Sequence, residues 1–198
     1  FVREVVKFWD IPLTVLQVDI NPELGQPNGY TVWEPKDIQT RMPVLKPFID
    51  MVKKYGTPYV GGAFCTDRLK LVPFTKYCDD HFGRGNYTTW IGIRADEPKR
   101  LKPKPGIRYL AELSDFEKED ILAWWKQQPF DLQIPEHLGN CIFCIKKSTQ
   151  KIGLACKDEE GLQRVFNEVI TGSHVRDGHR ETPKEIMYRG RMSLDGIA

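Results

Sequence analysis

The sequence predicts an α/β protein with a mostly parallel sheet that helices cover on both faces. Two observations support this class. In residues 1–9 the apolar side chains recur at i, i+3, i+4 and i+7, which is the spacing of one helix face. Residues 13–20 form a run rich in β-branched apolar side chains, which suits a strand buried on both sides. A helix followed by a buried strand indicates an α/β layer.

The next elements alternate between loops, helices and a strand. Residues 21–36 are rich in Pro, Gly and Asn and are predicted to form a long loop. A helix is expected from Pro43 to Tyr55, ended by Gly56, because proline suits the first turn and glycine the end of a helix. A second helix is expected over residues 69–81, and residues 87–93 are predicted to form a strand.

The second half of the chain begins with a basic stretch. Residues 99–108 contain five cationic side chains, no carboxylate and two prolines, so we expect a loop. Helices are expected between residues 114 and 128 and over residues 158–170. We divide the chain into a nucleotide-binding domain, residues 1–130, incomplete at its N-terminus, and a cysteine-containing segment, residues 131–198, packed on it.

Composition excludes several classes of protein. The 198 residues are 40% hydrophobic and 28% charged, unlike a disordered, collagen-like or membrane-spanning chain, and we expect no membrane partner. A net charge of +2 means that any affinity for phosphate requires local clustering of cations. Five cysteines without a signal-peptide pattern indicate metal binding or chemistry in a reducing cytoplasm.

The arrangement of the cysteines predicts a metal centre. Cys141 and Cys144 form a Cys-x-x-Cys pair, and Cys65 and Cys156 are the candidates that complete four ligands. Cys78 lies on the apolar stripe of its own predicted helix and is expected in the core. Four thiolates suit either zinc or a [4Fe–4S] cluster, and buried thiols without a metal are the alternative.

A second group of residues predicts an anion site. Arg68 and Lys70 follow Cys65, and Arg94 ends the strand predicted at residues 87–93, where ligands bind in open α/β sheets. Arginine forms bidentate contacts with phosphate or sulfate, and lysine supplies a point charge. Asp96 and Glu97 either pair with these cations, hold Mg²⁺ or are exposed. The alternative is that the charges form a solvated surface.

Four segments in order resemble the phosphoadenylyl-sulfate (PAPS) and adenylyl-sulfate reductases of the ATP-pyrophosphatase superfamily. Residues 65–74, Cys-Thr-Asp-Arg-Leu-Lys-Leu-Val-Pro-Phe, are similar to the family's Cys-Cys-x-x-x-x-Lys-x-x-Pro-Leu box, with Thr66 replacing the second cysteine. Residues 90–97 resemble its Gly-x-Arg substrate box, and residues 109–120 resemble the helix that follows it. Residues 139–144 match the late cysteine pair.

The resemblance implies an adenine nucleotide alpha-hydrolase-like fold and a [4Fe–4S] cluster beside a nucleotide-sulfate site. It makes Cys65, Cys141 and Cys144 cluster ligands, and Cys156 is our candidate for the fourth. It makes Lys70 and Arg94 the contacts to the phosphosulfate of PAPS or the phosphates of ATP. The family's Ser-Gly-Gly-x-Asp-Ser phosphate loop is absent, and we expect it upstream of Phe1. The Glu-Cys-Gly-x-His segment, whose cysteine attacks sulfate, is absent as well, so no catalytic residue is assigned.

Two functions from different classes remain open. The first is an iron–sulfur protein that acts on an adenine nucleotide, by sulfonucleotide reduction or by ATP-dependent sulfur transfer to a nucleic-acid or small-molecule target. Its further partners would be an electron or sulfur donor protein and a second copy of the chain. The second is a binding module in which a structural zinc site supports a basic loop that grips nucleic acid.

Overall fold

The computed structural model describes residues 1–38, 45–177 and 182–198, which form two compact units. The first unit contains residues 1–13 and 75–133, and the second contains residues 14–74 and 134–198. The division into domains 1–130 and 131–198 stays a prediction. Within the described ranges, no helix combines the length and the apolar character that crossing a membrane requires.

Aromatic side chains pack α1 against α4 in the first unit. This unit contains α1 (Val2–Trp9), most of α3 (Val72–Phe82), β3 (Thr89–Ile91), β4 (Ile107–Tyr109) and α4 (Lys118–Trp125). Trp9 stacks on Trp124 with their ring centroids 5.7 Å apart. The helix predicted at residues 1–9 is therefore confirmed. The prediction that Cys78 belongs to the core is also confirmed, since it is buried in α3.

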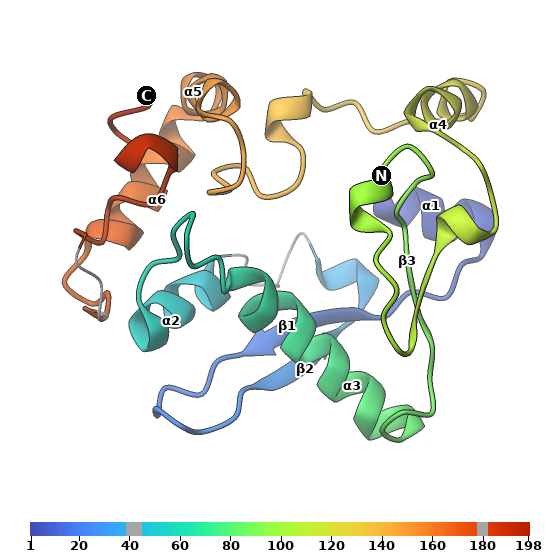
Figure 1. The fold of residues 1–198 in the computed structure, drawn as a ribbon, viewed down its shortest axis with the longest axis horizontal. Coiled ribbons are helices and arrows are strands. Elements are labelled where there is room, and N and C mark those ends of the chain that lie inside the picture. The colour runs from blue at the N-terminus through green and yellow to red at the C-terminus, as the bar shows by residue number, and fades with distance from the viewer. Residues whose placement is uncertain (39–44, 178–181) are drawn as a thin grey trace. The chain divides into compact units, whose positions relative to one another are not determined.

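The core of the second unit lies among its C-terminal helices. The unit contains β1 (Val15–Asp19), β2 (Gly29–Trp33), α2 (Lys46–Tyr55), a π-helical turn (Asp67–Leu71), α5 (Thr149–Asp158) and α6 (Glu160–Thr171). Figure 1 shows α5 and α6, in orange, beside the C-terminal residues drawn in red. Their buried side chains form one cluster that includes Ile152, Ile170, Met187, Tyr188 and Leu194.

The described residues form two sheets of two strands each, and the protein is mixed α/β. β1 and β2 are antiparallel, with Val15 opposite Trp33 and Asp19 opposite Gly29. β3 and β4 are parallel. The loop prediction for residues 21–36 is wrong over β2. Because the connection between β1 and β2, residues 20–28, is shorter than a parallel crossover requires, the chain turns back and pairs antiparallel.

The predicted helices are confirmed, and one further helix was not predicted. α2, α3, α4 and α6 match the helices predicted at residues 43–55, 69–81, 114–128 and 158–170. Pro43, the expected start of the first of these, lies outside the described residues. The sequence interpretation missed α5, because its buried side chains follow directly on a basic run; they are Ile152, Ala155 and Cys156.

Truncating Ile152 to alanine is expected to lower the free energy of unfolding by about 2–5 kcal/mol, because it leaves a cavity in the cluster around α5. Ile152 is fully buried, whereas Leu154, two residues later on the same helix, is 45% exposed. Leu154→Ala is the matched control and should change the unfolding free energy by less than about 0.5 kcal/mol. Urea denaturation of both variants tests the burial of α5, and equal effects would contradict it.

Candidate functional site

Two successive turns present the Cys-x-x-Cys pair at the surface of the second unit. The Cys144 N–H donates to the Cys141 carbonyl oxygen at 3.2 Å, and the Lys147 N–H donates to the Cys144 carbonyl oxygen at 2.9 Å. Phe143 and Ile145 lie on either side of Cys144 in sequence, and both are buried in the core cluster. These apolar side chains anchor the loop while Cys141 stays exposed and Cys144 half-buried.

Two side chains from outside the pair fix this loop further. The Lys147 ammonium donates to the carbonyl oxygens of His137 at 2.5 Å and of Ile142 at 3.1 Å. Burial lowers the pKa of Lys147, and the thiols of Cys141 and Cys144 raise it. The hydroxyl of the buried Tyr188 donates to the Phe143 carbonyl oxygen at 3.1 Å. Burial raises the pKa of Tyr188 far above its ordinary value, so the phenol stays protonated and keeps donating.

Replacing Tyr188 with phenylalanine is expected to lower the free energy of unfolding by about 1–3 kcal/mol, because a buried acceptor loses its donor. Tyr87→Phe is the matched control, since the Tyr87 hydroxyl donates to a carboxylate, Asp79, on the first unit. Denaturant unfolding of both variants checks the difference. An unchanged Tyr188→Phe midpoint would show that the hydroxyl does not anchor the cysteine loop.

Cys65 reaches the site from a tight glycine turn. A Cβ atom on Gly62 would lie 2.6 Å from the ring of Tyr59, so the turn favours glycine at this position. Cys65 begins the helical segment that continues through the π-helical turn into α3. In that turn the Val72 N–H donates to the Asp67 carbonyl oxygen, which is an i→i+5 bond.

Three thiols and two ammonium groups converge in the second unit. Desolvation raises the pKa of Cys141, and the thiols of Cys144 and Cys65 raise it further. The ammonium groups of Lys70 and Lys147 act in the opposite direction. Each of these groups is therefore close enough to Cys141 to change its protonation. The structure thus places Cys65, Cys144 and Lys70 within electrostatic range of Cys141.

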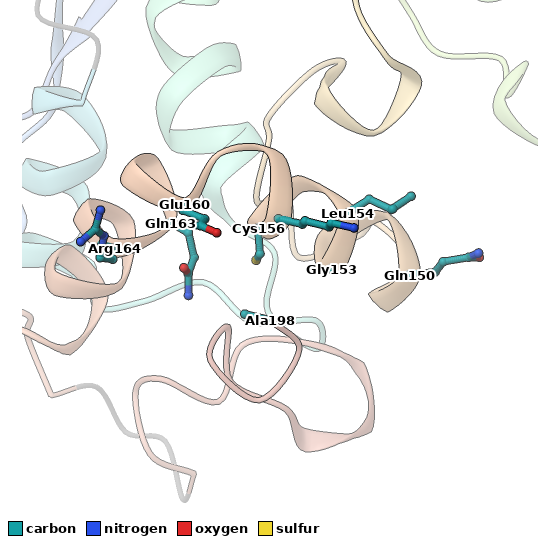
Figure 2. Close-up of a pocket in the computed structure, with 9 residues that line it drawn as sticks. Gln150, Gly153, Leu154, Cys156, Glu160, Gln163, Arg164 and Ala198 are labelled. Carbon is teal, nitrogen blue, oxygen red and sulfur yellow. The ribbon is translucent and has the colours of Figure 1, made fainter.

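Cys156 lies deeper than the other three candidate ligands. It is buried in α5 rather than just before a helix, and burial and the Asp195 carboxylate raise its pKa. Figure 2 shows its thiol pointing into a groove beside Gln163 and Ala198, with a volume of about 670 Å³. Cys156 and the cysteine loop both act electrostatically on Tyr188, because Cys141, Cys156 and Cys144 all raise the pKa of this phenol.

The chemistry of the donors fits a soft metal centre. Thiolates favour zinc or iron–sulfur clusters, and the nearby lysines offset part of their negative charge. Within the described ranges, however, no three His, Cys, Asp or Glu side chains adopt an arrangement that could hold a metal ion. In this structure, the described cysteine side chains of the site therefore do not adopt the geometry of metal ligands.

The predicted anion residues fall into two groups. Arg94, Asp96 and Glu97 belong to the first unit, and Arg68 and Lys70 belong to the second. The Arg68 guanidinium lies over the Tyr55 ring, 5.0 Å from its centroid, and 3.4 Å from the Asp67 carboxylate. Arg68 thus binds its own neighbours, whereas the exposed Lys70 acts electrostatically on Cys141.

Arg94 lies at the end of β3 with two carboxylates around it. Its Nε and Nη2 donate to the Asp96 carboxylate at 2.8 and 3.2 Å, and its Nη1 lies 3.8 Å from Glu97. The hydrogen bond to Arg94 lowers the pKa of Asp96, and a hydrogen bond from Arg100 lowers that of Glu97. Of the roles left open for these carboxylates, pairing with cations is the one observed.

An apolar pocket of about 460 Å³ adjoins Arg94 within the first unit. Its walls come from the end of β3, from residues 110–116 and from α4, and its side chains include Ile93, Leu110, Phe116 and Ile121. Pockets of this size that combine apolar walls with one or two charged groups are typical of small-molecule sites. Sequence reasoning missed this pocket, as it missed Lys147 and Tyr188, since no local pattern marks contacts between distant segments.

The chain matches no protein-family model, and no solved structure matches it significantly.

Proposed function

We propose that the protein is an iron–sulfur protein of the PAPS-reductase-like type that acts on an adenine nucleotide. The observation that supports the proposal is the electrostatic interaction of Cys141 with Cys144 and with Cys65, which lies far from this pair in the sequence. These are the positions that the resemblance assigns to cluster ligands. The finer fold, an adenine nucleotide alpha-hydrolase-like parallel sheet, is part of the same proposal.

Cys65, Cys141 and Cys144 would hold the [4Fe–4S] cluster, with Cys156 as the fourth ligand. When bound, such a cluster supplies electron transfer or a site for sulfur. Burial and the neighbouring cysteines raise the pKa of Cys141, and Lys70 and Lys147 offset part of this rise, because a nearby positive charge stabilises an anion. Tyr188 holds the backbone of the ligand loop through the Phe143 carbonyl.

The nucleotide would bind where the pocket in the first unit meets Arg94. The apolar walls suit a flat base or its ribose, and the guanidinium suits the phosphates of ATP or the phosphosulfate of PAPS. Asp96 orients the guanidinium by accepting from Nε and Nη2, and an anion at Nη1 would take the place of the weaker ion pair with Glu97, 3.8 Å away. Mg²⁺ would require Asp96 and Glu97 to exchange their arginine partners for the cation.

The test is the metal content and visible spectrum of anaerobically purified protein. We expect about four irons and four sulfides per chain, the stoichiometry of a cubane cluster, with a brown colour that reductant bleaches. Calorimetry then compares the two nucleotides. Tighter binding of ATP would favour sulfur transfer, and tighter binding of PAPS would favour sulfonucleotide reduction. One zinc per chain and no colour would overturn the iron–sulfur assignment in favour of a structural zinc site.

A further inference from the structure

We propose that the exposed face of the β3–β4 sheet, together with the basic loop of residues 99–108, binds single-stranded nucleic acid. This surface lies wholly within the first unit, whereas the cysteines of the candidate metal centre belong to the second. The inference therefore goes beyond the proposed function and does not depend on it.

An exposed aromatic side chain provides the platform for stacking. The parallel register places Trp90 of β3 directly beside Arg108 of β4, so both side chains emerge on the same face. The Arg108 guanidinium lies 5.1 Å from the centroid of the Trp90 ring, and 43% of Trp90 remains exposed. The residues on either side of Trp90 along β3 are half-buried, which is the alternation of a sheet with one solvated face.

The charge around this platform is positive. Residues 94–112 contain six Lys and Arg side chains and three carboxylates. All three carboxylates pair with arginines, which are Arg94, Arg100 and Arg108. In the part of the chain that the structure describes, no carboxylate pairs with Lys99, Lys102 or Lys104, and all three lysines are exposed. These lysines are therefore free to neutralise phosphates.

The loop that carries the lysines is fixed in place. The hydroxyl of the buried Tyr109 donates to the Lys102 carbonyl oxygen at 2.5 Å. Pro103 and Pro105 flank Lys104 and restrict the backbone φ angle on both sides of it. The Thr89 N–H donates to the Gly106 carbonyl oxygen at 2.8 Å, which ties the end of the loop to β3. Preorganised cations lose less conformational entropy when they bind a polyanion.

A single strand fits this combination better than a duplex. Unpaired bases expose their faces and stack on aromatic side chains or on arginine, whereas the bases of a duplex are stacked on each other. Lysines beside such a platform follow the sugar-phosphate backbone without reading sequence. We therefore expect binding that tolerates sequence, depends strongly on salt and uses Trp90.

The experiment measures fluorescence anisotropy of a labelled oligothymidine of about 15 nucleotides, a length within the usual range of single-strand sites. The wild-type chain should bind it more tightly than the same strand annealed to its complement. Double charge reversal, Lys102→Glu with Lys104→Glu, should weaken binding by about tenfold or more and reduce the salt slope by about 1.4. Lys7→Glu with Lys126→Glu is the matched control, since both lysines are exposed in the same unit.

Trp90 has a separate readout. Trp90→Ala should weaken binding by about tenfold, the effect of losing one stacked base. Trp90→Phe should keep most of the affinity but lose the quenching of tryptophan fluorescence on binding. The proposal is overturned if the oligonucleotide does not bind, if the duplex binds more tightly, or if the control pair weakens binding as much as the Lys102 and Lys104 pair. Because these measurements need no metal, their failure is distinct from a failure to find iron.

Discussion

Under the proposed function, replacing Cys144 with serine is expected to lower the iron content from about four irons per chain to nearly none. Serine keeps the size of the side chain but replaces a soft thiolate with a hydroxyl, which binds iron and zinc poorly. Cys141→Ser and Cys65→Ser should have the same effect, because the proposal makes both residues ligands of the same cluster and Cys65 acts electrostatically on Cys141. Iron and sulfide analysis of each anaerobically purified variant measures the result.

Cys78→Ala is the matched control for these variants. Cys78 is a free cysteine like the others, but it lies buried in the part of α3 that belongs to the first unit. Its removal should leave the metal content unchanged while lowering stability through a small cavity. Equal metal loss in Cys78→Ala and Cys144→Ser would contradict the ligand assignment, as would wild-type iron in Cys144→Ser.

The periodic helices and the strands β1 and β3 were predictable from the sequence, whereas β2 and β4 were not. The apolar faces of α1, α2 and α6 repeat at helical spacing over two turns or more, so the pattern is visible without any tertiary context. β4 has only three residues, follows a loop with two prolines and is stabilised by pairing with β3. β2 begins at the Asn28-Gly29 turn that led to the loop interpretation. In both strands long-range pairing outweighs the local turn signals.

The candidate site was predictable only where residues carried a pattern. The Cys-x-x-Cys spacing identified Cys141 and Cys144, and the resemblance to a family added Cys65. Lys147 and Tyr188 carry no such signal, because their roles depend on carbonyl oxygens that the fold brings to them. For Tyr188 the partner is 45 positions away in the sequence. Hydrogen bonds at that separation follow from the packing of the core and not from spacing.

Under the proposed function, replacing Arg94 with alanine is expected to weaken binding of the adenine nucleotide by about a hundredfold or more, because a charged hydrogen-bond partner of the anion is lost. Arg94 is partly exposed and its ion pairs are on the surface, so the fold should tolerate the change. Arg94→Lys keeps the charge but loses the planar fork, and should bind with intermediate affinity. Isothermal titration with ATP and with PAPS measures all three proteins, and metal analysis should show unchanged iron.

Arg100→Ala is the control that separates an anion contact from a general loss of positive charge. Arg100 pairs with Glu97, the same carboxylate that lies near Arg94, but it is more exposed and does not line the apolar pocket. Removing Arg100 leaves the Glu97 carboxylate without this partner, so the surroundings of the pocket become slightly more negative. Nucleotide binding should therefore weaken only slightly. If Arg100→Ala and Arg94→Ala weaken binding equally, the effect is one of long-range charge, and the pocket beside Arg94 is not where the phosphates bind.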